Sequence, residues 1–220
     1  MALLRVKPTA LDVTVANFIA RHTNRRAESL ARTLTWGADE KLLFGLTVLG
    51  WLACRRSNER SRRVADHFLA CAIASAILPH VMKRAIDQER PDRLTVAGHW
   101  RGVPISGNRW DAFPSGHAVH VGALASAATL LPPRYRAGAL VVGGVLVATR
   151  VILLAHWLTD VLAGLVIGTA IERSLRQLTQ PDAEPKRRDV SRPVRRGAHA
   201  RSTASVREPL GHTRPRAALR

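Results

Sequence analysis

The chain has 220 residues, of which 46% are hydrophobic, and its 34 Lys+Arg against 16 Asp+Glu give a formal net charge of +18. This length is typical of one domain, and the apolar content excludes a fully disordered protein. Two cysteines exclude a disulfide scaffold and a multi-cysteine zinc site. The basic excess indicates a nucleic acid or an anionic membrane as a partner.

Residues 1–40 carry apolar residues at helical spacing, but arginines repeatedly interrupt the apolar face. This pattern favours an amphipathic helix in the membrane interface over a helix that crosses the bilayer. The segment has no apolar core followed by a small-residue cleavage site, so we expect no signal peptide.

Five apolar runs follow between residues 41 and 172, and we predict that each crosses the membrane. Several are shorter than the about 20 residues that a spanning helix needs, a shortfall that polar helix ends, snorkelling arginines or local thinning can offset. The prediction is an all-α, polytopic membrane bundle of about five helices, and the alternative is a soluble bundle with buried helices. The runs are Leu42–Cys54, Phe68–Met82, Ala118–Leu131, Ala137–Ala155 and Trp157–Ile171.

Residues 173–220 hold 13 Lys/Arg, four Asp/Glu and five prolines. So little apolar surface cannot offset the entropy of ordering, and we predict a disordered basic tail. The arginines of this tail, of residues 55–63 and of residues 134–136 would share one side, which the positive-inside rule makes cytoplasmic. Residues 83–116 would then lie outside, and the polytopic plan indicates a bacterial inner membrane.

Polar residues cluster at three places near the predicted outer ends of these runs. Lys83 and Arg90 are seven residues apart, so on one helix ending at Pro91 both would face the same way. The stretch 114–117, Pro-Ser-Gly-His, would open the next helix, whose free N–H groups form an anion site.

The third cluster joins the last two runs. Arg150 would end one helix, while His156 and Asp160 would begin the next with a spacing of four residues, so that the carboxylate could hold the imidazole. Each cluster alone has an ordinary structural explanation. All three clusters would meet at the outer face of the membrane, however. Charged and polar side chains are costly near hydrocarbon, so this convergence predicts a functional site.

The chemistry open to these clusters is limited. Three cations and a helix start could stabilise a phosphate and its transition-state charge. Two histidines allow one nucleophile and one general acid. The sequence offers no cluster of carboxylates or cysteines suited to a divalent metal, so we expect no metal and no other cofactor.

The three clusters read Lys83-x6-Arg90-Pro91, Pro114-Ser115-Gly116-His117 and Thr149-Arg150-x5-His156-x3-Asp160. In this order and spacing the sequence resembles the phosphatidic acid phosphatase type 2 superfamily over residues 41–172. The resemblance implies a helical core shared with haloperoxidases. One departure is Thr149, where the family usually has serine, and threonine keeps the hydroxyl.

The resemblance also implies a role for each motif residue. His156 would attack phosphorus, Asp160 would fix its tautomer, and His117 would protonate the leaving group. The phosphoryl oxygens would be bound by Lys83, Arg90, Ser115, Gly116 and Arg150.

The implied function is metal-independent hydrolysis of a lipid phosphate or diphosphate, such as undecaprenyl pyrophosphate or phosphatidic acid, at the outer face of the membrane. Anionic membrane lipids would contact the basic loops and tail. The alternatives are a soluble acid phosphatase or vanadium haloperoxidase-like enzyme of the same superfamily, and a non-catalytic membrane scaffold with an anion-binding tail. The tail has no aromatic residues for base stacking, so no specific nucleic acid is expected.

Overall fold

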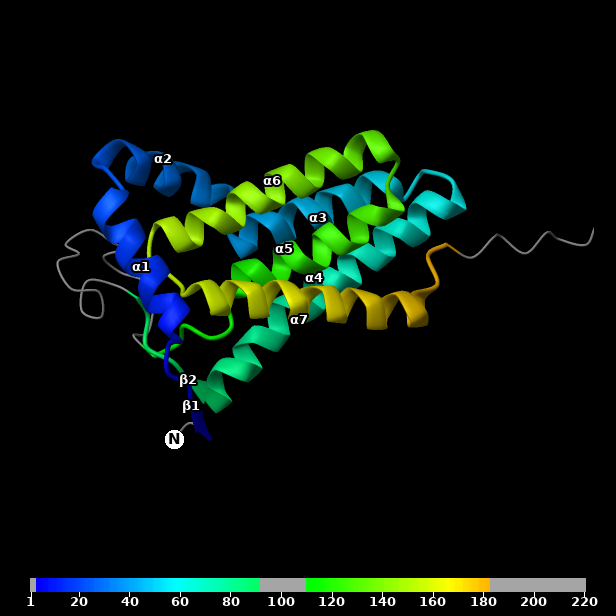
Figure 1. Ribbon diagram of the computed structural model, residues 1–220. Helices are drawn as coiled ribbons and strands as arrows, with labels where there is room; N and C mark the ends of the chain where they lie inside the picture. Colours follow the sequence, from blue (N-terminus) through cyan, green and yellow to red (C-terminus); the bar gives the residue numbers. More distant parts are fainter. Residues whose placement is uncertain (1–2, 92–109, 183–220) are drawn as a thin grey trace, which may run out of the picture. The chain divides into compact units, whose positions relative to one another are not determined.

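The computed structural model describes residues 3–91 and 110–182, which form helices and one short pair of strands (Figure 1). All five predicted helices are present, with shifted ends. They are α3 (Glu40–Cys54), α4 (Glu59–Ala85), α5 (Gly116–Ala127), α6 (Pro133–Ile152) and α7 (Leu158–Thr179).

Local capping sets where these helices begin. The Asp39 side chain accepts hydrogen bonds from the backbone N–H groups of Lys41 and Leu42 at the start of α3. The Asn58 side chain accepts from Ser61 N–H at the start of α4. Such side chains satisfy N–H groups that have no partner inside the helix.

The N-terminal segment forms two helices, α1 (Ala10–His22) and α2 (Arg25–Thr35), where the sequence predicted one interfacial helix. The break lies at Thr23 and Asn24, both of which have extended backbone. The Asn24 side chain accepts from Ala27 N–H and so starts a new helix. The single-helix prediction was wrong because the apolar spacing continues across this cap.

Helix α5 lies at the centre of the bundle and packs most closely on α7. A Cβ atom at Gly122 would collide with the backbone of Leu165, and one at Gly168 would collide with that of Val119. Only glycine fits at such close backbone approaches, which are typical of helices packed inside a membrane. This contact brings the starts of α5 and α7 together, with Ser115 N–H donating to the Asp160 carbonyl at 3.3 Å.

A buried polar network ties the opposite half of α7 to α4 and α5. The Glu172 carboxylate, which is fully buried, accepts from Ser126 Oγ at 2.5 Å and lies 3.1 Å from His67 Nε2. Arg176 Nε donates to the same carboxylate at 2.6 Å. These contacts hold α7 in place as far as Thr179, past residue 173, where the tail was predicted to begin. Residues 183–220 of that tail lie outside the described residues.

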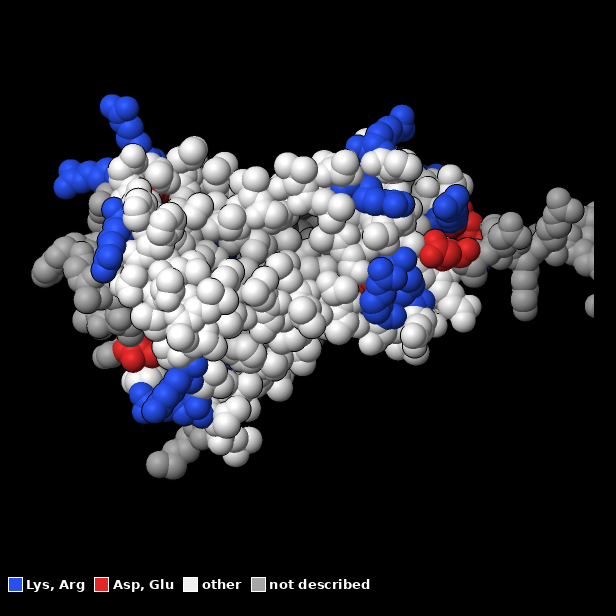
Figure 2. All heavy atoms as spheres, in the orientation of Figure 1, with Lys and Arg blue, Asp and Glu red and all other residues white. Residues whose placement is uncertain are grey.

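The outer surface of the bundle is strongly apolar. Figure 2 shows lysine and arginine side chains at two ends of the visible face, with uncharged surface between them. Exposed apolar side chains on this scale are typical of lipid contact and disfavour the soluble alternative. They are Leu42, Leu46, Leu49 and Leu52 on α3, Ile73, Ile77 and Val81 on α4, Leu140, Val141, Val142 and Val145 on α6, and Leu162 and Val166 on α7.

Within the described ranges, two helices are long and apolar enough to cross a membrane, α4 with 27 residues and α6 with 20. Helices α3 and α5 have 15 and 12 residues, fewer than the about 20 that a straight span requires. The count of five membrane spans therefore stays a prediction.

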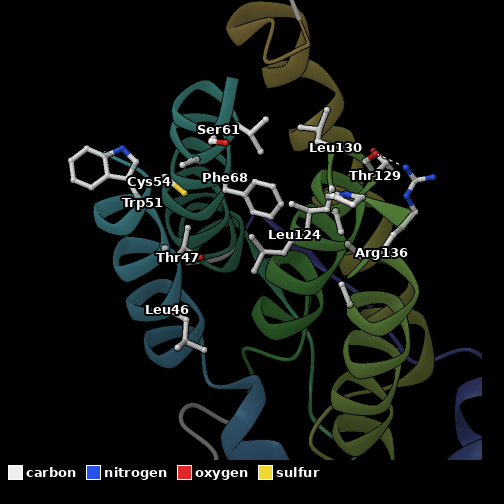
Figure 3. A pocket seen from close by; sticks show the side chains of 18 of the residues that line it. Leu46, Thr47, Trp51, Cys54, Ser61, Phe68, Leu124, Thr129, Leu130 and Arg136 are labelled. Carbon is white, nitrogen blue, oxygen red and sulfur yellow. Dashed lines mark hydrogen bonds between the residues drawn. The ribbon is translucent and has the colours of Figure 1, made fainter. Parts of the chain in front are cut away.

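A large hollow of about 1070 Å³ lies among α3, α4, α5 and α6 (Figure 3). Phe68 and Leu124 point into it, and most of its lining is apolar. At its edge Arg136 Nη2 donates to the Thr129 carbonyl at 2.8 Å.

Candidate active site

A smaller cavity of about 160 Å³ lies where the ends of α4 and α6 meet the starts of α3 and α5. Six of the eight predicted site residues line it: Lys83, Arg90, Gly116, His117, Arg150 and His156. The structure thus brings residues from all three sequence clusters to one place. The other two, Ser115 and Asp160, are fully buried and are not part of the lining.

Lys83 and Arg90 reach the cavity by a route that the sequence did not predict. Helix α4 ends at Ala85, and Ile86–Asp87 forms a short strand, β2, that pairs in parallel with β1 (Leu4–Arg5). Arg90 therefore lies beyond the end of the helix that carries Lys83. The prediction that one helix carries both residues was wrong. The helix ends before Arg90 because β2 pairs with β1, a strand far away in the sequence that no local pattern indicates.

Asp111 holds these two cations together. Its Oδ1 accepts from Arg90 Nε at 2.9 Å and from Arg90 Nη2 at 2.7 Å, and its Oδ2 lies 3.7 Å from Lys83 Nζ. Arg90 Nη1 also donates to the Ala155 carbonyl at 3.0 Å. The Arg90 guanidinium therefore links the segment before α5 to the turn before α7, close to His156.

The second cluster opens α5 as predicted. Ser115 is the N-cap, and its Oγ accepts from Ala118 N–H at 3.5 Å. This bond turns the Ser115 hydroxyl toward its own helix, whereas Gly116 and His117 face the cavity. The N–H groups of the first helical turn carry partial positive charge, so the start of α5 is suited to an anion.

The turn between α6 and α7 carries His156. The Arg150 carbonyl accepts from Ala155 N–H at 3.0 Å and from His156 N–H at 3.4 Å. Leu154 has φ of 51°, a left-handed conformation that leucine rarely adopts, and it is almost fully buried. The buried turn therefore fixes the direction in which the His156 side chain leaves the backbone.

A backbone carbonyl orients the His156 ring. His156 Nδ1 lies 2.7 Å from the Ala112 carbonyl oxygen. A carbonyl can only accept, so Nδ1 donates and carries the proton, which leaves the lone pair on Nε2. The neutral ring is thus in the tautomer that a nucleophile attacking through Nε2 requires.

Asp160 acts on the His156 ring less directly than the sequence predicted. Its Oδ2 is 3.9 Å from His156 Nδ1, longer than a hydrogen bond, and accepts from Trp157 N–H at 2.9 Å. His156 precedes α7, so the helical spacing of four residues does not apply to the pair. Asp160 caps α7 and places a buried carboxylate near the imidazole, while Ala112 fixes the tautomer.

Burial lowers the pKa of His156, and the nearby charges of Arg90, Arg150 and Lys83 lower it further. Both causes disfavour the protonated ring. His156 is therefore neutral at pH 7 when the site is empty.

Sequence reasoning missed several residues at this site. Asp39, Glu40 and Lys41 line the cavity from the start of α3, and Asp111 and Ala112 contact site residues from behind it. Proximity to the Pro-Ser-Gly-His stretch could have drawn attention to Asp111 and Ala112. The acidic pair at 39–40 gives no signal in the sequence beyond its role as a helix start.

Comparison with known proteins finds relatives of this chain. The model of the PAP2 superfamily matches residues 65–182, slightly more than half of the chain. The lipid A 1-phosphatase of Rhizobium etli is 38% identical over 106 residues, which cover 48% of this chain and 46% of that protein. The lipid A 1-phosphatase of Rhizobium johnstonii is 41% identical over 106 residues, covering 48% and 43%. The matched region thus spans slightly less than half the length of these relatives.

Two solved structures share the fold. LpxE of Aquifex aeolicus superposes with a TM-score of 0.60 and 16% identity, covering 80% of this chain and 99% of that one. The transmembrane PAP2-type phosphatidylglycerolphosphate phosphatase of Bacillus subtilis gives 0.58 and 17%, covering 80% and 87%. The predicted all-α fold is confirmed by these likenesses.

Proposed function

Because the chain belongs to the PAP2 superfamily, we propose that it is a membrane phosphatase that hydrolyses a lipid phosphate. The observation that carries the proposal is the small cavity, whose lining brings the imidazoles of His117 and His156 together with the cationic side chains of Lys83, Arg90 and Arg150. A pocket so lined matches a tetrahedral anion and a reaction that needs both a nucleophile and an acid.

The phosphate group would be held by charge and by the helix start. Lys83, Arg90 and Arg150 supply N–H donors around the cavity, and Gly116 lets an oxygen approach the backbone at the start of α5. Cationic donors already in place stabilise the extra negative charge that develops in the transition state. Ser115 would act through the cap of α5 because its hydroxyl is bound there.

Hydrolysis would proceed in two steps. His156 Nε2 attacks phosphorus, a P–N bond forms, the P–O bond to the lipid breaks, and His117 gives its proton to the departing oxygen. A water molecule then gives a proton to His117 and attacks phosphorus, which breaks the P–N bond and releases phosphate. Asp160 and the Ala112 carbonyl stabilise the charge on the His156 ring while the phosphoryl group is attached.

The proposed reaction needs no metal, because the cationic side chains of Lys83, Arg90 and Arg150 line the cavity and would neutralise the phosphate. The carboxylates of Asp39 and Glu40 line the same cavity. They are adjacent residues at one helix start, and the described residues hold no group of three or more acidic, histidine or cysteine side chains that could bind a metal ion. Saturating chelator should therefore leave turnover within about twofold of the untreated rate, measured as phosphate release. Activity that is lost with chelator and restored by a divalent cation would contradict this part of the proposal.

A lipid as the organic part of the substrate is supported by the large apolar hollow. Its lining includes Leu43, Val121 and Leu146, each within about one helical turn of a residue that lines the small cavity. The matched relatives are named lipid A 1-phosphatases, which favours a phosphate monoester on a glycolipid. Undecaprenyl pyrophosphate and phosphatidic acid, the substrates that the sequence predicted, are tested together with a lipid A 1-phosphate in the panel below.

The proposal puts the cavity at the outer face of a bacterial inner membrane. The arginines of residues 55–63 and 134–136 lie at the other ends of α4 and α6, and an arginine-rich side is cytoplasmic by the positive-inside rule. The same arginines would contact anionic lipid headgroups.

The function is tested by phosphate release from detergent-solubilised protein across a panel of lipids. The panel contains a lipid A 1-phosphate, phosphatidic acid, phosphatidylglycerol phosphate and undecaprenyl pyrophosphate. The proposal expects release from at least one of them at a rate that a soluble sugar phosphate does not reach. Release from none of the four would contradict it.

The pH dependence follows from the state of His156. The ring must be neutral to attack, and its pKa in the empty site is lowered by burial and by Arg90, Arg150 and Lys83. As pH falls, kcat/KM should therefore stay high through the usual histidine pKa of about 6.5 and decline only at more acidic pH. A kcat/KM profile with its acidic limb centred at or above that value would contradict the proposed electrostatics.

A further inference from the structure

We infer that two residues of the N-terminal segment, residues 3–41, position groups of the active site: Thr35 orients Arg150, and Asp12 fixes the helix start that follows His156. The inference deepens the proposed function and rests on it. The matched family region begins at residue 65, so the whole segment lies outside it.

Thr35, at the end of α2, is the residue that orients Arg150. Arg150 Nη1 donates to Thr35 Oγ1 at 3.0 Å. Within the described ranges Arg150 makes no ion pair with a carboxylate, whereas Lys83 and Arg90 are both paired with Asp111. A neutral hydroxyl aims the guanidinium without forming an ion pair, so the charge of Arg150 stays available to a phosphate.

Asp12, in the first turn of α1, fixes the start of α7. Its carboxylate is 1% exposed and accepts from Thr159 N–H at 2.9 Å and from Thr159 Oγ1 at 2.7 Å. Thr9 N–H and Oγ1 donate to the same carboxylate at 2.9 and 2.8 Å. A buried carboxylate with four donors at a helix start is a strong restraint. Thr159 is three residues after His156, so the restraint acts next to the proposed nucleophile.

An apolar contact reinforces this restraint. Ala16 of α1 is buried in one cluster with Ala112, Leu154 and Trp157. Ala112 supplies the carbonyl that orients His156, and Leu154 and Trp157 flank that residue in its turn. Helix α1 therefore packs on the residues that set the position of the imidazole ring.

These contacts assign different effects to the two positions. Loss of the Thr35 hydroxyl should weaken phosphate binding because Arg150 is no longer aimed. Loss of the Asp12 charge should slow the chemical step because the His156 turn is less well fixed. Neither residue lines the cavity, so each acts through another side chain.

The first test is Thr35→Val, which keeps the branched shape and removes the hydroxyl. The matched control is Thr33→Val on the same helix, where the exposed Thr33 Oγ1 donates only to the Ser29 carbonyl. Orthovanadate, a phosphate analogue, serves as the probe, and its affinity is measured by calorimetry beside kcat and KM. Thr35→Val should weaken vanadate binding about tenfold with the melting temperature unchanged, Thr35→Ser should restore it, and Thr33→Val should match wild type.

A double-mutant cycle separates positioning from general damage. Thr35→Val should cause no further loss of vanadate affinity when Arg150 is already alanine, because the coupling runs through that side chain. Equal losses in both backgrounds, or wild-type affinity in Thr35→Val, would overturn the assignment of Thr35. Because vanadate binding is measured without turnover, this result is separate from failure of the lipid panel, which overturns the proposed function alone. Absence of vanadate binding to wild type would overturn both.

Asp12→Asn tests the second position. Asparagine keeps the size, but its amide nitrogen cannot accept from Thr159 and Thr9. We expect kcat to fall about tenfold with vanadate affinity within about twofold of wild type. A lower melting temperature with unchanged kcat would show a purely structural role and would overturn the assignment of Asp12.

Discussion

Replacing His156 by alanine should lower phosphate release from the lipid substrate by at least about a thousandfold. The residue is the proposed nucleophile, and its Nδ1–H bond to the Ala112 carbonyl leaves Nε2 as the attacking atom. Without an imidazole, the cationic side chains still bind phosphate but no covalent step is possible. The measurement is the initial rate of phosphate release at saturating lipid.

The matched control for this substitution is His22→Ala. His22 lies at the exposed end of α1, where its ring stacks on Phe18 at 4.2 Å between centroids, and it takes no part in the cavity. It should keep the wild-type rate. Retention of more than about a tenth of the rate by His156→Ala would exclude covalent catalysis through this residue.

Replacing Arg150 by alanine should lower kcat/KM by about a hundredfold to a thousandfold, the cost of losing one preorganised donor for transition-state charge. Arg150 is nearly buried, and among the described residues it has a hydroxyl and no carboxylate as its partner. Lys83 and Arg90, by contrast, both pair with Asp111. Kinetics on the active lipid of the panel give the value.

Arg150→Lys should recover only part of this loss, because lysine keeps the charge without the planar fork of donors. Arg134→Ala is the matched control on the same helix, since the Arg134 guanidinium lies 4.7 Å from the centroid of the Tyr135 ring at the other end of α6. We expect that control to behave as wild type. Equal kcat/KM values in Arg150→Ala and Arg134→Ala would contradict the proposed role of Arg150 in stabilising the transition state.

The sequence predicted the five helices because each holds an apolar run that is bounded by charged or proline-containing stretches. Ser115 was recognised as a helix start, whereas Asp39 and Asn58 cap α3 and α4, which begin two and nine residues before the predicted apolar runs. The meeting of Lys83 and Arg150 at one cavity was also predictable, because alternate helices return to the same side.

The details that failed depend on contacts between distant residues. Arg90 was assigned to a helix because Pro91 offered a plausible end, but β2 pairs with β1 and the chain leaves the helix at Ala85. His156 was expected to bond Asp160 through helical spacing, but it lies in a turn before α7 and bonds Ala112. No local pattern encodes either contact.

The N-terminal segment shows the same limit. Its apolar spacing indicated helical structure, and its place at the membrane interface stays a prediction. Neither the break at Asn24 nor the partners of Asp12 and Thr35 could be predicted. Hydrogen bonds such as that between Asp12 and Thr159 join residues 147 positions apart.

The central claim is that His156 forms a covalent bond to phosphorus. It is tested by rapid alkaline quenching of the wild-type protein during reaction with a lipid carrying labelled phosphate, followed by peptide mapping. Because a P–N bond forms before water attacks, we expect the label on the peptide that contains His156, and no label on that peptide in His156→Ala. Label on another residue, or turnover with no labelled protein at any reaction time, would contradict the account.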